Sequence, residues 1–177
     1  STAVLMLAVG CSNGGANTPA PAGSSDTSGE NSSKNVTVGI IQYMDHVALD
    51  SAREGFIEAL KANGYVEGEN LTIDYQNAQG DQSNLSTISD RFVSNKVDLV
   101  LAIATPAAQS IAGKTTEIPI LATAVTDFEA AKLVDSNEAP GGNVSGTTDM
   151  NPIKEQIDLL AKLVPDAKTV GVLYTSS

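Results

Sequence analysis

Short apolar runs alternate with amphipathic stretches over residues 36–122 of this 177-residue chain. Runs of β-branched and other apolar residues predict strands, and apolar positions at helical spacing predict helices. The expected strands are 36–41, 71–75, 97–103 and 118–122. The expected helices are 46–62, 83–95 and 106–114. Strands that alternate with helices at such short intervals are typical of βαβ units, so we expect an α/β fold: an open parallel sheet with helices on both faces.

The pattern changes further along the chain. A Pro-Gly-Gly-Asn loop at 140–143 precedes a brief extended piece at 144–147. A helix is then expected from Asn151 and Pro152, because proline is tolerated at the first helical position. Pro165 should end this helix.

A fresh strand is predicted at 170–174, where valine, leucine and tyrosine follow one another. We therefore expect a second βαβ series to open near the end of the sequence. We expect residues 36–149 to form a first α/β lobe. Residues 150–177 should hold a hinge crossing and the start of a second lobe that is largely missing.

The first 35 residues have a different composition. An apolar run ends at Gly10 and Cys11, which is typical of a bacterial secretory signal followed by a lipoprotein cleavage site. We expect residues 1–11 to be the remnant of a signal peptide, and Cys11 to carry the lipid that anchors the protein outside the cytoplasmic membrane. A buried structural cysteine is the alternative. Residues 12–35 are mostly small and polar and should form a flexible linker.

The two ends of the sequence suggest a fragment. No initiator methionine and no basic stretch precede the apolar run, and the chain stops directly after the last expected strand. We therefore expect a chain that is clipped at both ends.

Charge and composition restrict the function. The net charge of −11 argues against a nucleic-acid partner, which would require clustered lysine and arginine. One cysteine and one histidine argue against an internal disulfide and against a thiolate or imidazole metal cluster. No glycine-rich dinucleotide fingerprint follows the first expected strand. His46 has no obvious acid partner, so we expect neither an enzyme nor a cofactor.

Polar and small residues follow the expected strands, where open parallel sheets bind their ligands. The candidate ligand-binding residues are Gln42, Tyr43, Thr105, Pro106, Ala107, Thr126, Asp127, Thr175 and Ser176. Thr105 as N-cap and Pro106 as first helical residue would leave free N–H groups suited to a carboxylate or phosphate. Plain helix capping would need the same two residues.

Two further candidates have equally ordinary alternatives. Asp127 could pair with a ligand ammonium, or it could cap a short helix through Ala131. Tyr43 could supply a flat apolar wall, or it could pack at the edge of the sheet. The residues alone leave these alternatives open.

Several motifs together resemble the ABC-transporter substrate-binding proteins of the tryptophan/tyrosine-binding type. They are VGIIQ at 38–42, ATPAAQ at 104–109, AVTD at 124–127, GNVSG at 142–146 and GVLY at 171–174. A further match has Asp50, Arg53, Gly55 and Phe56 in one helix. The resemblance extends in order over residues 36–177.

This resemblance implies a two-lobed, type I periplasmic-binding-protein fold with a cleft between its lobes. The implied ligand is a small solute, often an aromatic amino acid, and the implied partners are a membrane permease and an ATPase. By position, the binding loops of the first lobe fall on Gln42–Tyr43, 104–106 and 126–127, and a loop of the second lobe begins at 175–176. We expect a monomer when the protein is complete.

Other functions remain open at this point. The same fold could serve as the ligand-binding ectodomain of a sensor, or the protein could be an exported α/β enzyme. Because most of the second wall of the cleft would be absent, we expect weak or no ligand binding by the 177-residue chain and tight binding by a full-length protein.

Overall fold

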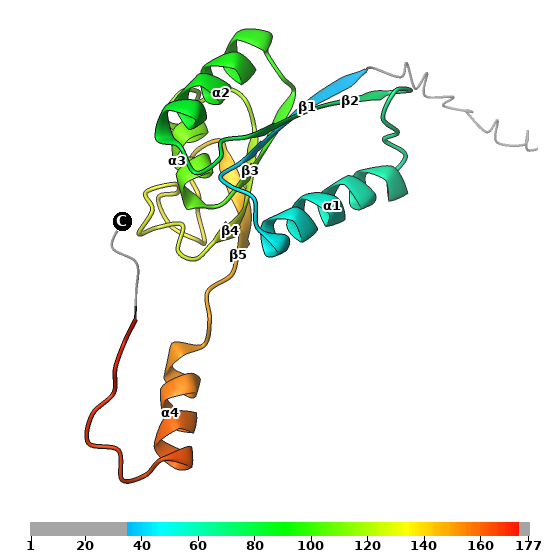
Figure 1. The fold of residues 1–177 in the computed structure, drawn as a ribbon. Helices are drawn as coiled ribbons and strands as arrows, with labels where there is room; N and C mark the ends of the chain where they lie inside the picture. Colours follow the sequence, from blue (N-terminus) through cyan, green and yellow to red (C-terminus); the bar gives the residue numbers. More distant parts are fainter. Residues whose placement is uncertain (1–34, 174–177) are drawn as a thin grey trace, which may run out of the picture. The chain divides into compact units, whose positions relative to one another are not determined.

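The computed structural model describes residues 35–173 (Figure 1). The elements run in the order β1 (Val36–Gln42), α1 (Val47–Ala62), β2 (Leu71–Asn77), α2 (Gln82–Asn95), β3 (Leu99–Ile103), α3 (Thr105–Ala112), β4 (Ile120–Val125), β5 (Val144–Thr148) and α4 (Ile153–Leu163). The expected alternation of strands and helices is therefore confirmed through β4.

The strands form one parallel sheet in the order β2-β1-β3-β4-β5. The chain moves from β1 outward to β2 and then returns to place β3 on the other side of β1. The order therefore reverses between β1 and β3. In open α/β sheets such a reversal leaves a crevice beyond the carboxyl ends of the strands, which is where ligands bind.

Alternating side chains of the strands build a core on each face of the sheet. Val38, Ile40 and Leu101 belong to the core beneath α1. Ile41 and Ala102 belong to the core beneath α2 and α3. Figure 1 shows α1 on one face of the sheet and α2 and α3 on the other. This arrangement confirms the predicted sheet with helices on both faces, and it explains why β1 and β3 are nearly all apolar.

The first two crossover helices begin at side-chain caps. His46, the first residue of the predicted helix, is the N-cap of α1, and its Nδ1 accepts from the N–H of Ala48 at 3.2 Å. Asp81 is the N-cap of α2, and its Oδ1 accepts from the N–H groups of Ser83 and Asn84. Each cap satisfies backbone donors that the helix itself leaves unpaired.

Some predicted boundaries were displaced. β3 begins at Leu99 rather than Val97. β4 begins at Ile120 rather than Ile118, since Pro119 has no N–H to give to a ladder, and it continues to Val125. The extended piece at 144–147 is a full strand, β5, at the edge of the sheet beside β4.

The last part of the chain differs most from the prediction. α4 begins at Ile153, with Pro152 as its N-cap rather than its first residue, and no residue of this helix is buried. Residues 170–173 form no strand, and Val170, Val172 and Leu173 are exposed. The predicted strand is wrong for these residues because a strand requires a partner ladder, and none pairs with them here.

Some predictions concern residues outside the described range. They are the signal remnant with Cys11, nearly all of the linker at 12–35, Tyr174, Thr175 and Ser176. Within residues 35–173, no helix is both long enough and apolar enough to cross a membrane.

Candidate functional site

Three of the predicted binding segments meet at one edge of the sheet. β1, β3 and β4 are parallel neighbours, with Gln42 opposite Ile103 and Ile103 opposite Thr123. Backbone hydrogen bonds continue past the strands, from Tyr43 N to the Ile103 oxygen at 3.2 Å and from Ala104 N to the Thr123 oxygen at 3.0 Å. The loops that carry Tyr43, Thr105 and Asp127 therefore leave the same edge of the sheet.

A single residue connects β3 to α3. β3 ends at Ile103, α3 begins at Thr105, and Ala104 between them has φ 82° and ψ 152°. Only glycine adopts this backbone region readily. The predicted capping is therefore wrong: Ala104 is the N-cap, and Thr105 and Pro106 are the first and second helical residues. A one-residue connection leaves no space for a conventional cap with an extended backbone.

The first turn of α3 has free donors at the edge of the sheet. No side chain caps it, and Ala108 N already bonds to the Ala104 oxygen at 3.1 Å. Of the first three residues, Pro106 lacks an N–H, so the donors belong to Thr105 and Ala107. Ala107 as a whole is buried, backbone included, whereas Thr105 is partly exposed, so of these two donors Thr105 is the one nearer to solvent. An uncapped helix start attracts a carboxylate or another anion.

Tyr43 is half-buried and packs against the core beneath α2 and α3. Its backbone is held on both sides, because its N–H donates to β3 and its carbonyl accepts from Gly80 N at 2.8 Å. The packing alternative raised by the sequence is therefore found. A half-buried ring at this edge can also present a face to a ligand.

Asp127 begins a turn rather than a helix. Its Oδ1 accepts from Ala130 N at 2.9 Å, and its carbonyl accepts from Ala131 N at 3.1 Å. The expected short helix is therefore absent, but one carboxylate oxygen of Asp127 caps the turn, and the residue as a whole is exposed. Thr126, also exposed, is tied to the end of β5, since Thr148 Oγ1 donates to its carbonyl at 2.6 Å.

Gln42 is fully buried and its amide is engaged within the protein. Its Nε2 donates to the Met44 carbonyl and to Asp50 Oδ1, both at 2.9 Å, and its Oε1 accepts from Arg53 Nη1 at 3.3 Å. A buried amide in full use is better placed to hold the β1–α1 loop than to bind a solute.

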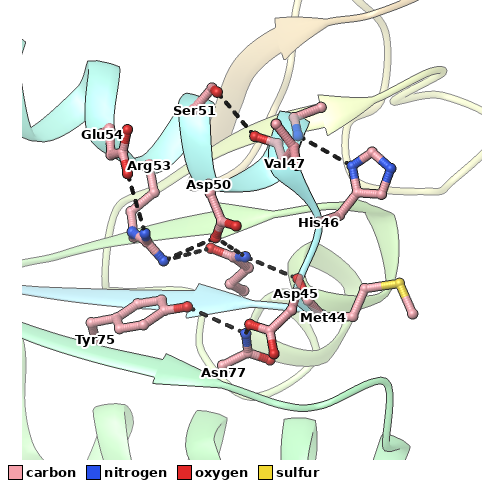
Figure 2. Close-up of polar contacts among 12 residues, drawn as sticks. Met44, Asp45, His46, Val47, Asp50, Ser51, Arg53, Glu54, Tyr75 and Asn77 are labelled. Carbon is pink, nitrogen blue, oxygen red and sulfur yellow. Dashed lines mark hydrogen bonds and ion pairs between the residues drawn. The ribbon is translucent and has the colours of Figure 1, made fainter.

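Residues not predicted for the site complete this polar cluster. Arg53 also bonds to Asp50 Oδ1 at 3.2 Å, and its guanidinium carbon lies 4.4 Å from the centroid of the Tyr75 ring. Figure 2 shows Arg53 directed at Asp50, and Asn77 between Tyr75 and Asp45. The opposite charges at positions 50 and 53, three residues apart in a predicted helix, were a sequence signal for the first pair.

The prominent cavities lie away from Tyr43 and Thr105. One of about 380 Å³ lies beside β5 and is lined in part by Phe128, Ser145 and Thr148. It borders the candidate rim at Phe128, next to Asp127, and at Thr148, which bonds to Thr126. No group of three or more His, Cys, Asp or Glu side chains within residues 35–173 is placed to hold a metal ion.

Taken together, the fold and this edge define a class of protein. A parallel sheet with an order reversal, a free helix start and polar loops at its carboxyl edge is the architecture of an α/β ligand-binding lobe. The sequence model of the family described as ABC transporter substrate binding protein matches residues 37–177. The chain belongs to this family, which confirms the resemblance seen in its motifs.

Three relatives support this assignment. The tyrosine-binding protein of Clostridioides difficile (strain R20291) is 45% identical over 174 residues, which are 98% of this chain and 49% of that protein. The ligand-free, open structure of a substrate binding protein with adhesive properties from Clostridium difficile is 47% identical, with a TM-score of 0.70 over 75% of this chain and 45% of that one. The ABC domain in complex with L-Trp from Streptococcus pneumonia is 40% identical, with a TM-score of 0.71 and the same two coverages.

The chain spans about half the length of these relatives. A leucine binding protein from Thermotoga maritima, 17% identical with a TM-score of 0.52, shares the fold alone. The relatives are substrate-binding proteins and not enzymes, as expected for this chain.

Proposed function

We propose that this chain supplies one wall of a cleft that captures a free amino acid for an ABC importer, with tyrosine and tryptophan as the first candidates. The support is chemical as well as comparative. One relative is named for tyrosine binding, and another was solved with L-Trp. A free amino acid carries a carboxylate and an ammonium close together, and the candidate rim offers a partner for each.

The observation that carries this proposal is the one-residue junction at Ala104. Because β3 leads directly into α3, the free N–H groups of Thr105 and Ala107 lie at the same edge as Tyr43 and Asp127. In the proposed complex the Thr105 N–H holds the ligand carboxylate together with the positive end of the helix dipole, to which the buried Ala107 N–H contributes.

The other groups at the rim complete the proposed contacts. Asp127 holds the ligand ammonium, and Tyr43 forms a wall. Pro106 and Thr126 border the same edge and shape it. Gln42 keeps the β1–α1 loop in place.

A second wall is needed to complete the site. Burying two ligand charges is unfavourable unless each is paired, and closure between two lobes provides that pairing. We propose that residues 150–177 contain the hinge crossing and the start of a second lobe, with Thr175 and Ser176 at its rim, while residues 36–149 form the first lobe.

The proposed cellular setting follows from the first residues and from the family. The protein is held outside the cytoplasmic membrane by lipid on Cys11, at the end of a signal sequence, and residues 12–35 act as a tether. It delivers its solute as a monomer to a permease driven by an ATPase. Metabolic labelling with a fatty-acid probe tests the anchor: label that disappears in Cys11→Ala supports it, and unlabelled wild-type protein rejects it.

Ligand binding is best tested in a chimera. The chain is joined to the part of the C. difficile relative that has no counterpart here, and amino acids are titrated into the chimera in a calorimeter. We expect tyrosine or tryptophan to bind the chimera at least about a hundredfold more tightly than the 177-residue chain, because a closed cleft pairs both ligand charges. Equal affinity for both proteins would reject the two-wall cleft.

A substitution at the rim tests the contribution of this chain. Asp127→Asn keeps the oxygen that accepts from Ala130 N but removes the charge, so it should weaken binding by about tenfold without unfolding the chimera. Glu138→Gln removes an exposed charge outside the candidate rim and is the matched control. If both variants bind as the parent does, Asp127 is not the ammonium partner.

A further inference from the structure

A continuous polar network joins the carboxyl ends of β1 and β2 to the start of α1, next to the loop that carries Tyr43. Its centre is the buried amide of Gln42, which uses both N–H groups and its oxygen in contacts to Met44, Asp50 and Arg53. Burying an amide is unfavourable unless its hydrogen bonds are made, so these contacts have to be retained in the folded chain.

The amide has a defined orientation because its two partners carry opposite charges. A carboxylate only accepts and a guanidinium only donates, so Nε2 must face Asp50 and Oε1 must face Arg53. With Nε2 fixed in this way, its second hydrogen donates to the carbonyl of Met44, two residues further along the chain. This bond closes the first turn of the loop around Tyr43.

Arg53 is itself held from several sides. Its Nη1 contacts Asp50, its Nη2 lies 3.8 Å from Glu54 Oε1, and its guanidinium lies over the ring of Tyr75 on β2. Only 19% of its side chain is exposed. A partly desolvated guanidinium over an aromatic face is attracted to it more strongly than one in water. Arg53 therefore connects α1, β1 and β2 at one point.

The end of the loop is held from β2 as well. Asn77 Nδ2 donates to Asp45 Oδ1 at 2.6 Å and to the Tyr75 hydroxyl at 3.3 Å, and Asn77 Oδ1 accepts from Gln79 N at 2.8 Å. Figure 2 shows Asn77 beside Asp45, which directly precedes the N-cap of α1. The loop between β1 and α1 is thus fixed at both ends.

We propose that Gln42, Asp50 and Arg53 are positioning residues that preform the β1–α1 loop, so that Tyr43 is ordered before the solute arrives. The proposal rests on the proposed function, because it takes Tyr43 as a wall of the solute site. The three residues do not touch the solute. A loop that is ordered in advance removes an ordering cost from binding, and affinity rises accordingly.

The first test uses the 177-residue chain without any ligand. Hydrogen exchange is followed at the Tyr43 and Gly80 amides, whose bonds to the Ile103 and Tyr43 carbonyls report on this loop. In Asp50→Ala and in Arg53→Met we expect both amides to exchange about tenfold faster or more, while amides in the centre of β3 stay unchanged. Asp50→Asn keeps an acceptor oxygen for Gln42 and should restore slow exchange.

A second arginine–aspartate pair supplies the control. Arg91 on α2 contacts Asp74 on β2 through Nε at 3.0 Å and Nη2 at 2.8 Å, without touching the β1–α1 loop. The Arg91 side chain is 52% exposed, against 19% for Arg53, and Arg91→Met should leave the exchange of Tyr43 and Gly80 unchanged. The Asp50 side chain is 36% exposed, so the fold should tolerate its truncation in Asp50→Ala. Unchanged protection of the Tyr43 and Gly80 amides in this variant would overturn the proposal, even if Arg53→Met failed to fold.

The second test measures tyrosine or tryptophan affinity in the chimera. Arg53→Met should weaken binding by about tenfold, Asp50→Asn should stay within about twofold of the parent, and Arg91→Met should not change it. If Arg53→Met speeds the exchange of the loop amides but leaves ligand affinity unchanged, the proposal that the network positions the loop for ligand binding is overturned. If the parent chimera binds no amino acid, the proposed function fails, whereas the exchange experiment still decides whether the network orders the loop.

Discussion

The ring of Phe92 on α2 lies directly against the backbone of Gly39 in β1. A Cβ atom at position 39 would lie 2.8 Å from both Cδ2 and Cε2 of that ring, which is fully buried. Glycine inside a strand often marks a close approach of this kind. Here it allows α2 to pack closely against one of the two strands that flank the order reversal.

Gly39→Ala should therefore destabilise the chain. Neither the ring nor the strand can move away freely in a close-packed core, so we expect a loss of about 1–3 kcal/mol in urea unfolding. Gly55→Ala is the control, since a Cβ at this position in α1 meets nothing within 4 Å. That substitution should stabilise the chain by up to about 1 kcal/mol. Equal stability of the two variants would contradict the packing argument.

A second prediction concerns the junction between β3 and α3. Ala104→Gly should stabilise the chain, because glycine adopts φ 82° and ψ 152° without the strain that alanine carries there. Relief of that strain, reduced by the extra freedom of glycine in the unfolded chain, leaves a gain of about 1 kcal/mol.

The control for this junction lies two residues earlier. Ala102 is buried in the middle of β3 and has no positive φ, so Ala102→Gly should be destabilising. Thermal melts of both variants test the argument. It is refuted if Ala104→Gly lowers the melting temperature as Ala102→Gly does.

A third prediction concerns pH. The hydrogen bond from the Ser83 hydroxyl, followed by those from the Asn84 and Ser83 N–H groups, lowers the pKa of Asp81 below its ordinary value. The unfolded chain therefore takes up the proton first as the pH falls, so this contribution to stability is complete above the unfolded pKa and is lost as pH falls through the folded pKa.

Asp81→Asn keeps an oxygen to cap α2 but cannot titrate. Between about pH 5 and pH 3, the melting temperature of the parent chain should fall more steeply than that of Asp81→Asn, because the ordinary pKa of aspartate is near 3.9. Glu138→Gln, which removes an exposed carboxylate outside the α2 cap, is the control. Parallel curves for the parent chain and Asp81→Asn would show that the cap does not favour the ionised form.

The layout of the sheet was predictable because strands that are buried on both faces require continuous apolar runs. β1 and β3 are such strands, and their burial explains the runs at 38–41 and 99–103. The placement of the candidate rim followed from the same pattern, since parallel strands bring their carboxyl ends to one edge. Residues 170–173 have the composition of a strand, but a strand also requires a neighbour to pair with.

Details of the rim were less predictable because they depend on contacts between distant residues. The conformation of Ala104 follows from the one-residue junction, whereas alanine itself gives no sign of a positive φ. The sequence predicts a ligand contact at Gln42 because this residue follows an expected buried strand. Its contacts in the structure depend on Arg53, eleven residues away, which in turn lies over Tyr75 in another strand. Only the Asp50–Arg53 spacing was visible locally.

The GNVSG motif at 142–146 also has a structural explanation. Asn143 Nδ2 donates to the carbonyls of Ile118 at 2.7 Å and Thr115 at 3.1 Å, and the Asn143 carbonyl accepts from Ile120 N at 2.9 Å. These hydrogen bonds hold the start of β5 against the start of β4. At the other end of the motif, a Cβ on Gly146 would collide with the carbonyl of Ala122.

Asn143→Asp should consequently be more destabilising than Asn143→Ala. Alanine loses two hydrogen bonds, which corresponds to about 1–2 kcal/mol. Aspartate loses the same bonds and also places a carboxylate against two carbonyl oxygens, so a larger loss is expected in urea unfolding at neutral pH. The two carbonyls favour the protonated carboxyl in the folded chain, so the difference should shrink as the pH falls towards about 4, and the protonated carboxyl can donate one hydrogen bond again. Asn151→Asp, at an exposed position before α4, should change little. If Asn143→Asp matches Asn143→Ala at every pH, the side chain of Asn143 does not act as the donor that fastens β5.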